Sequence, residues 1–406
     1  MFWIRIIYFI LRPAVPALRS QVMELSSRDE GSKIDYGLVL TLMLFCIVSL
    51  VAIYTANSSY LIKQVINYVV GAIIIALVIR LDSDQLKKIS WYGYGFGILL
   101  LILLILAPAS IAPERNGAKN WFVLPVIGTF QPSEIMKPFL ILAMARLISD
   151  HNEKVLNRSV KSDFWLFVKL GICLFVPLML TIQQDLGTSL VFIAIFFGLV
   201  FVSGITWKLM LPIFGSGAAL AGLIFYLVLW QPALLEKYLG VRSYQFGRIY
   251  AWIDPYNYSN TDGYHLIQSL LAIGSGQTFG KGLGTTEVSL PENQTDFIFS
   301  VIGEQFGFIG GSIVIGLFFM LIYHIIKAGL ETKNDFYSYI CAGVIAMITF
   351  HVFENIGMTI QVLPITGIPL PFISYGGSSL IGNMLAVGFI FSIRYHYRKY
   401  MFSNEK

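Results

Sequence analysis

The chain has 406 residues, of which 56% are hydrophobic and only 13% are charged. Soluble domains contain about 25% charged residues, so this composition excludes a water-soluble enzyme and predicts an integral membrane protein. The formal net charge of +5 follows from the basic loops that set membrane topology, and no nucleic-acid partner is expected. The three cysteines are isolated in apolar runs, so neither a CxxC metal site nor a disulfide framework is indicated.

Apolar runs of about 17 to 25 residues recur along the chain. Each is long enough to cross the bilayer as a helix, which satisfies every backbone polar group internally. We therefore expect an all-α integral membrane protein, a polytopic bundle of about ten transmembrane helices. The predicted spans are residues 36–56, 61–79, 91–107, 132–149, 164–182, 186–203, 207–230, 297–326, 336–362 and 374–393.

Lysine and arginine gather in the loops after the even-numbered spans, and the positive-inside rule places those loops in the cytoplasm. The residues concerned are Arg80, Lys87, Lys88, Lys154, Arg158, Lys161, Lys208, Lys327, Lys333, Arg394, Arg398 and Lys399. This topology predicts cytoplasmic tails at 1–35 and 394–406 and a single membrane domain at 36–393. A long extracytoplasmic loop, 231–296, joins spans seven and eight.

Residues 1–22 combine a short apolar stretch with three arginines. The stretch is too short to span the bilayer and lacks a small-residue cleavage site. We expect either an interfacial helix or an upstream extension, with Met23 as the native start.

The loop before span four, APERNGAKNWFVLPVIGTFQPSEIMK, carries Arg115 and Lys119. Pro132 suits the first position of a helix, and Ser133 and Lys137 share a face of its first turns. Cations near a helix N-terminus favour phosphate binding. The alternative is that these charges are merely solvated, but a lysine inside a lipid-embedded helix is costly, which favours a function.

Two further outer segments carry candidate polar residues. QQDLGT places Asp185 and Thr188 at the outer surface, although a solvated turn explains them equally well. In the long loop, Arg248 offers another cation, and the spacing in 263–273 predicts an amphipathic interfacial helix. The glycine run after it is not a nucleotide-binding loop, because no strand precedes it and the spacing is wrong.

The long loop ends in LPENQTDFIF, which puts the carboxylates Glu292 and Asp296 at the entrance of span eight. Asp296 suits either a helix cap or a catalytic base. Glu304 lies about 12 Å deeper and is costly in hydrocarbon, so we expect a polar cleft alongside this helix. His351 and Glu354 in span nine are predicted to pair with each other.

Seven sequence blocks occur in an order typical of one family: NGAKNW, FQPSEIMK, QQDLGT, RIYAWIDP, GYHLIQSLLAIGSGQTFGKGLG, LPENQTDFIF and NIGMTIQVLPITGIPLPFISYGGSS. Together they resemble the SEDS family of peptidoglycan glycosyltransferases, over all ten spans. The last block and the RYHYRKY tail are more similar to the rod-shape elongation members, RodA, than to the division and sporulation members, FtsW and SpoVE.

The resemblance implies β-1,4 polymerisation of lipid II at the outer face of the bacterial cytoplasmic membrane. Asp296 matches the family's essential aspartate and is the expected general base, and Trp121 matches a family tryptophan. The departing pyrophosphate needs positive charge, which we expect from Arg115, Lys119, Lys137 and Arg248, with a magnesium or manganese ion left open. Further expected substrate-binding residues are Ser133, Asp185, Thr188, Glu292 and Glu304. A class B penicillin-binding protein is the expected partner.

Three positions depart from the family pattern: Gln294 replaces a histidine, Asn120 an arginine and Gln184 a proline. The first removes a proton relay, so Asp296 is expected to act alone or through water. Rival hypotheses are a lipid flippase or secondary transporter, the division or sporulation role within the family, and a scaffold. A transporter needs its ionisable residues near the midplane in broken helices, whereas the candidate residues here gather at the outer rim.

Overall fold

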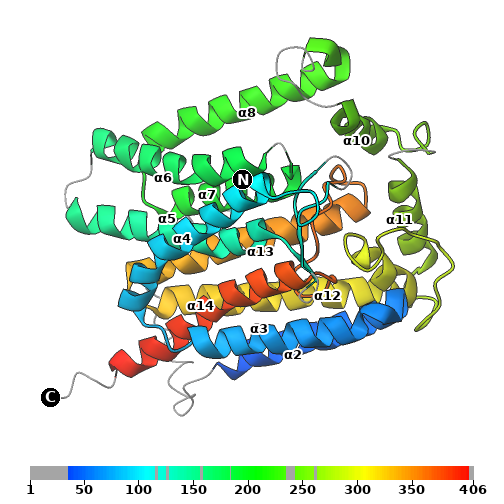
Figure 1. Ribbon diagram of the computed structural model, residues 1–406, viewed down its shortest axis with the longest axis horizontal. Coiled ribbons are helices and arrows are strands. Elements are labelled where there is room, and N and C mark those ends of the chain that lie inside the picture. The colour runs from blue at the N-terminus through cyan, green and yellow to red at the C-terminus, as the bar shows by residue number, and fades with distance from the viewer. Residues whose placement is uncertain are drawn as a thin grey trace.

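The computed structural model describes residues 35–114, 118–124, 128–155, 159–182, 184–234, 243–259 and 263–401 (Figure 1). In this part of the chain, ten long helices coincide with the ten predicted spans, which confirms the all-α class. They are α2 Tyr36–Asn57, α3 Leu61–Val78, α4 Ser83–Leu106, α5 Pro132–Lys154, α6 Val160–Thr181, α7 Leu186–Val202, α8 Trp207–Trp230, α12 Ile298–Glu331, α13 Asp335–Thr359 and α14 Gly377–Met401. The predicted tail from residue 394 onward thus continues α14 to Met401.

Short elements join these helices. The 3-10 helix η1, Ser58–Tyr60, lies between α2 and α3, and the long loop contains α10, Ser243–Ile253, and α11, Gly263–Ser275. The predicted amphipathic helix is therefore present as α11. The strands β1, Phe122–Leu124, and β2, Gly128–Phe130, form an antiparallel hairpin just before α5.

Seven helical stretches in the described residues are long and apolar enough to cross a membrane, and one of them, Tyr36–Val78, contains both α2 and α3. Helix α7 is apolar but shorter, with 17 residues. Helix α5 is not among the seven, because polar side chains occupy its first turns. The chain is a multi-pass membrane protein.

Helix α5 occupies the interior of the bundle. It packs against α4, α6, α7, α13 and α14, and Leu140–Ala145 are completely buried. Because protein surrounds α5, it can carry polar groups that a lipid-facing helix could not. Helix α8, in contrast, lies at one edge of the bundle (Figure 1), and only Met210 and Val228 are buried on it.

The long helices lie side by side, while α11 crosses one end of the bundle and α10 lies at the same end (Figure 1). We call this end, where α5, α7, α12 and α14 begin, the site end. Helix α12 is interrupted at Gly307, whose φ is +62°. An added Cβ there would lie 2.5 Å from the Gly280 nitrogen, so only glycine permits this close approach of the loop to the helix.

Candidate active site

Asp296 lies half-buried in the segment that leads into α12. The side chain of Asn355, on α13, donates a hydrogen bond of 2.7 Å to the Asp296 carbonyl oxygen. One residue earlier, the Ser374 hydroxyl donates to the Thr295 carbonyl at 2.6 Å, and the Tyr375 N–H donates to the Gln294 carbonyl at 2.8 Å. The backbone around Asp296 is therefore held by α13 and by the segment before α14.

The surroundings of Asp296 favour its protonated form. The pKa of this carboxyl group is raised to about 7. Desolvation is the main cause, the nearby charges of Glu292 and Asp185 also raise the pKa, and Arg248 lowers it. A carboxylate whose pKa lies near neutrality suits a general base, because it is partly ionised and still basic enough to accept a proton.

A glycine allows the Asp296 carboxylate to approach the opposite loop. Gly367 has a φ of +75°, and a Cβ added there would lie 3.2 Å from Asp296 Oδ2. In the same loop, the Ile365 carbonyl accepts a hydrogen bond of 3.5 Å from the Arg248 guanidinium. The structure thus brings the predicted residues Asp296 and Arg248 together across this loop.

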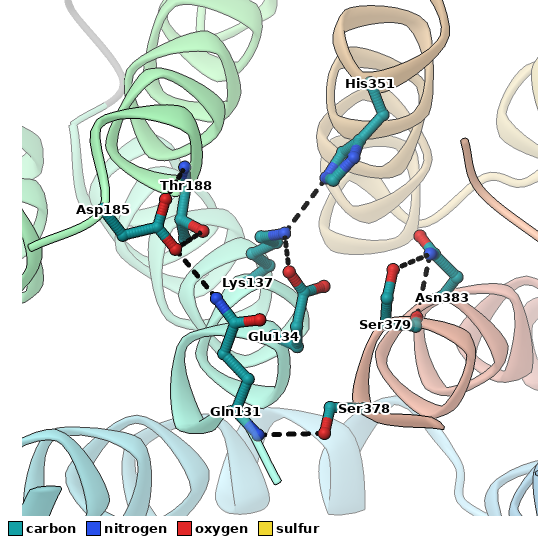
Figure 2. Close-up of polar contacts among 9 residues, drawn as sticks. All are labelled: Gln131, Glu134, Lys137, Asp185, Thr188, His351, Ser378, Ser379 and Asn383. Atoms are coloured by element: carbon teal, nitrogen blue, oxygen red, sulfur yellow. Dashed lines mark hydrogen bonds and ion pairs between the residues drawn. The ribbon is translucent and has the colours of Figure 1, made fainter. Parts of the chain in front are cut away.

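Asp185 caps the N-terminus of α7, and Figure 2 shows its contacts. Its carboxylate accepts hydrogen bonds from the Thr188 N–H at 2.9 Å, from the Thr188 hydroxyl at 2.6 Å and from the Gln131 side chain at 2.8 Å. The Gln131 N–H in turn donates to the Ser378 hydroxyl. The starts of α5, α7 and α14 are thereby tied together at the site end, close enough for Asp185 to act on Asp296.

Lys137 does not face an open phosphate site. Its side chain is 2% exposed, forms an ion pair of 2.6 Å with Glu134 and lies 3.1 Å from His351 Nε2 (Figure 2). Ser133 beside it is also buried. Because His351 Nε2 contacts Lys137, and His351 Nδ1 has no hydrogen-bond partner among the described residues, the predicted pairing of His351 with Glu354 is wrong.

The loop before α5 uses its polar side chains to hold the backbone. The Lys119 ammonium donates to the carbonyl oxygens of Ile105, at 2.9 Å, and Ala107, and so satisfies the C-terminal end of α4. Asn120 donates to the Gln184 carbonyl at 3.1 Å, which joins two of the positions that depart from the family pattern. Trp121 is half-buried just before β1. Arg115 lies outside the described residues.

The Glu304 side chain contacts the long loop instead of lining the polar cleft that the sequence predicts. Its carboxylate, 3% exposed, pairs with Lys281 at 3.1 Å and accepts hydrogen bonds from the backbone N–H groups of Glu287 and Val288. Lys281 also pairs with the Glu287 side chain at 2.8 Å. We call Lys281, Glu287 and Glu304 the loop clasp, because together they fasten the loop to α12.

Glu292 is exposed and takes a positive φ of 53°. It accepts hydrogen bonds from Thr295 and Gln294, so the glutamine in the usual histidine position contacts this carboxylate. Among the described residues, no group of three or more His, Cys, Asp or Glu side chains is arranged to hold a metal ion. These residues alone do not fit a protein-only metal site.

Sequence comparison decides the family. The chain matches the FtsW/RodA/SpoVE family, described as cell cycle proteins, over residues 32–399. The chain belongs to this family. It is 30% identical to the peptidoglycan glycosyltransferase RodA of Treponema pallidum (strain Nichols), over 89% of this chain and 98% of that protein. It is 36% identical to the peptidoglycan glycosyltransferase MrdB of Escherichia coli (strain K12), over 69% of this chain and 72% of that protein.

Solved structures of this family have the same fold. A chain from a peptidoglycan synthase complex, whose structure concerns the coordination of polymerization and crosslinking, matches with a TM-score of 0.72 and 26% identity over 91% of this chain and 99% of that one. The crystal structure of the rod shape determining protein RodA of Thermus thermophilus matches with a TM-score of 0.63 and 26% identity, over 90% and 97%.

The structure adds several residues to the site. Asn355 and Gln131 were not among the sequence candidates, although an asparagine within a membrane helix was a usable signal. Ser374 acts through its hydroxyl group and Gly367 through its backbone conformation, and the sequence offers only the SYGGSS and TGIPLP segments as signals for them.

Proposed function

We propose that this chain is a peptidoglycan glycosyltransferase that polymerises lipid II into β-1,4-linked glycan strands, with Asp296 as the general base. The observation that carries the proposal is the placement of the Asp296 carboxylate, held through Asn355 and against the loop that Arg248 contacts. The raised pKa of Asp296, about 7, agrees with a role as base. Relatives covering most of the chain are peptidoglycan glycosyltransferases.

The reaction transfers the glycan of one lipid-linked substrate to the terminal sugar of another. The 4-hydroxyl of one N-acetylglucosamine attacks the anomeric carbon of the other substrate and gives its proton to the Asp296 carboxylate. A C–O bond forms there as the bond to undecaprenyl pyrophosphate breaks, and the pyrophosphate leaves with the electron pair. The charge of Arg248 favours this developing anion. Asp185 keeps the start of α7 in place through Thr188 and Gln131.

The proposal includes a magnesium or manganese ion at the pyrophosphate. Magnesium is commonly held by one or two carboxylates and by substrate phosphates, so the substrate would supply the ligands that the described residues lack.

The site end faces the outside of the cytoplasmic membrane in this proposal. The opposite end carries basic residues at or just after the ends of α3, α5, α7 and α12, among them Arg80, Lys154, Lys208 and Lys333. The positive-inside rule places that end and both termini in the cytoplasm.

Cell elongation, with a class B penicillin-binding protein as partner, is the proposed cellular role. The similarity to RodA proteins over nearly their full length supports elongation. The similarity to a chain in a complex that couples polymerization and crosslinking supports a transpeptidase partner, because the chain itself is almost entirely membrane helices.

A lipid transporter is the alternative of another class, because Glu134, Lys137 and His351 are ionisable groups inside the bundle. An assay with purified protein in detergent micelles distinguishes the two functions. Micelles have no compartments between which a lipid could be transported, whereas polymerisation needs none. We expect labelled lipid II to yield glycan strands that lysozyme digests, with greater yield when a class B penicillin-binding protein is added. Unchanged lipid II under both conditions would exclude polymerase activity.

A further inference from the structure

Polar residues from several elements follow one another around the site end. Asn67 on α3 lies against Gly377 at the start of α14. Ser378 accepts from Gln131, which reaches Asp185. Asp185 acts electrostatically on Asp296.

Further contacts connect the segment that carries Asp296 back to α3. The Gln294 carbonyl accepts from the Tyr375 N–H, and Tyr375 packs against Tyr60. Lys63 lies over the Tyr60 ring. On α3, Lys63 and Asn67 are four residues apart and share one face, so the same face of α3 borders both series of neighbours.

Lys63 was not a candidate from the sequence, and it differs from the lysines that were. Lys119 holds the end of α4, and Lys137 is buried against Glu134. The Lys63 side chain is exposed, and within the described part of the chain no carboxylate forms an ion pair with it; its neighbour is the Tyr60 ring, 5.8 Å away. A lysine in this situation can accept an anionic ligand without first breaking an ion pair.

Tyr60 and Tyr375 form an aromatic surface beside this cation. Their ring centroids are 4.4 Å apart with an interplanar angle of 38°, and both side chains are partly exposed. Gln64 connects the pair to the backbone, since its side chain donates to the Ser49 hydroxyl and the Ser374 carbonyl. Tyr375 is therefore fixed relative to both α3 and the segment that carries Asp296.

We propose that Lys63, Tyr60 and Tyr375 bind the sugar-diphosphate end of one lipid-linked substrate. The Lys63 ammonium contacts the diphosphate as a point charge, and the tyrosine rings present apolar faces with polar tips to the first sugar. Lys63 is the third residue of α3, at the level of the lipid headgroups where a membrane-anchored diphosphate lies. The identity of the substrate rests on the proposed function, but recognition of a diphosphate does not.

Direct binding of inorganic pyrophosphate to the full-length protein, measured by calorimetry, tests the cation. Wild type is expected to bind, Lys63→Gln to bind about tenfold more weakly, and Lys63→Arg to bind within threefold of wild type because the charge is kept. Lys161→Gln is the matched control, since Lys161 is an exposed lysine at the opposite end of the bundle. Equal binding by Lys63→Gln and Lys161→Gln overturns the proposal.

Initial rates against lipid II concentration test the role in the reaction. Lys63→Gln is expected to raise KM about tenfold with little change in kcat, because the contact is made in the ground state as well. Tyr375→Ala, which removes the aromatic ring, is also expected to raise KM. Normal KM values in both Lys63→Gln and Tyr375→Ala overturn the proposal while leaving the polymerase function intact. Pyrophosphate binding through Lys63 without any glycan product would reject the polymerase function alone.

Discussion

The side-chain amide of Asn355 joins two backbone segments of the active site, with hydrogen bonds of 2.7 Å to the carbonyl oxygens of Asp296 and Ile368. Asn355 is completely buried in α13. A membrane helix therefore fixes both the backbone of the proposed base and the loop on the other side of its carboxylate.

Replacing Asn355 by leucine keeps most of the volume but leaves two buried carbonyl groups without a donor. An unsatisfied buried group costs about 1–3 kcal/mol, so we expect a lower unfolding temperature and a kcat reduced by about tenfold or more, as expected for a displaced base. Asn383→Leu is the control, because Asn383 is also buried but donates only within α14, to Ser379. Similar kcat values for the two variants would contradict the positioning role.

The pH dependence of polymerisation follows from the raised pKa of Asp296, about 7. A base must be ionised to accept a proton, so kcat/KM is expected to rise about tenfold per pH unit below 7 and to level off above it. The profile of kcat/KM between pH 5 and 9 checks this. A flat profile from pH 5 upward would show that no group with this pKa controls the reaction.

The raised pKa of Asp296 also makes the free energy of unfolding depend on pH. The folded protein holds a proton on Asp296 at pH values where the unfolded chain has lost it. The free energy of unfolding therefore falls as the pH rises from about 4 through 7, and this contribution is lost completely above pH 7. Asp296→Asn is therefore expected to unfold at a higher temperature than wild type at pH 8, and the difference is expected to shrink toward pH 5. Thermal unfolding in detergent at both pH values measures it, and an equal difference at both would argue against the pKa shift.

The buried ion pair of Lys137 and Glu134 predicts that substitutions of these two residues have strongly non-additive effects on the free energy of unfolding. Lys137→Met leaves the Glu134 carboxylate without its cation in the bundle interior (Figure 2), which costs about 3–5 kcal/mol. The double variant Lys137→Met, Glu134→Leu removes both charges and is expected to recover most of the lost stability. A double variant as unstable as the sum of the two single variants would show that the pair does not act as a unit.

The loop clasp predicts where the long loop opens. Glu304→Ala removes the acceptor for Lys281 and for two backbone N–H groups, so residues 280–292 are expected to exchange amide hydrogens about tenfold faster. Hydrogen exchange followed by mass spectrometry measures this, with α13 as the internal reference. Equally faster exchange in the loop and throughout α13 would indicate global destabilisation instead, and unchanged exchange in the loop would contradict the prediction.

The sequence predicts the helices well because lipid demands long apolar runs. It misplaces some ends: α4 begins at Ser83 instead of 91, because its first turns are polar and Asp82 and Gln85 form a capping box that apolar runs cannot reveal. Residues 132–149 were predicted as one of the apolar runs, and α5 does form there, although it is too polar to be among the seven membrane-span candidates.

The candidate site is predicted less completely, because the sequence does not identify the residue that a charged side chain contacts. Asp296 and Arg248 lie together as the motifs suggest. Lys119 instead reaches backbone carbonyls, and Glu304 is paired with Lys281, 23 residues earlier. Only the ion pair of Lys137 with Glu134 was accessible to sequence reasoning, since residues three apart in a helix are neighbours.

The most direct test of the account is lipid II polymerisation by Asp296→Asn, compared with Glu292→Gln in equal amounts of folded protein. Asparagine keeps the shape of the side chain but cannot accept the proton, so we expect a kcat at least about 100-fold lower than in wild type. Glu292→Gln is expected to stay active, because Glu292 is exposed and acts on Asp296 only through its charge. Glycan synthesis at the wild-type rate by well-folded Asp296→Asn protein would contradict the assignment of Asp296 as the base.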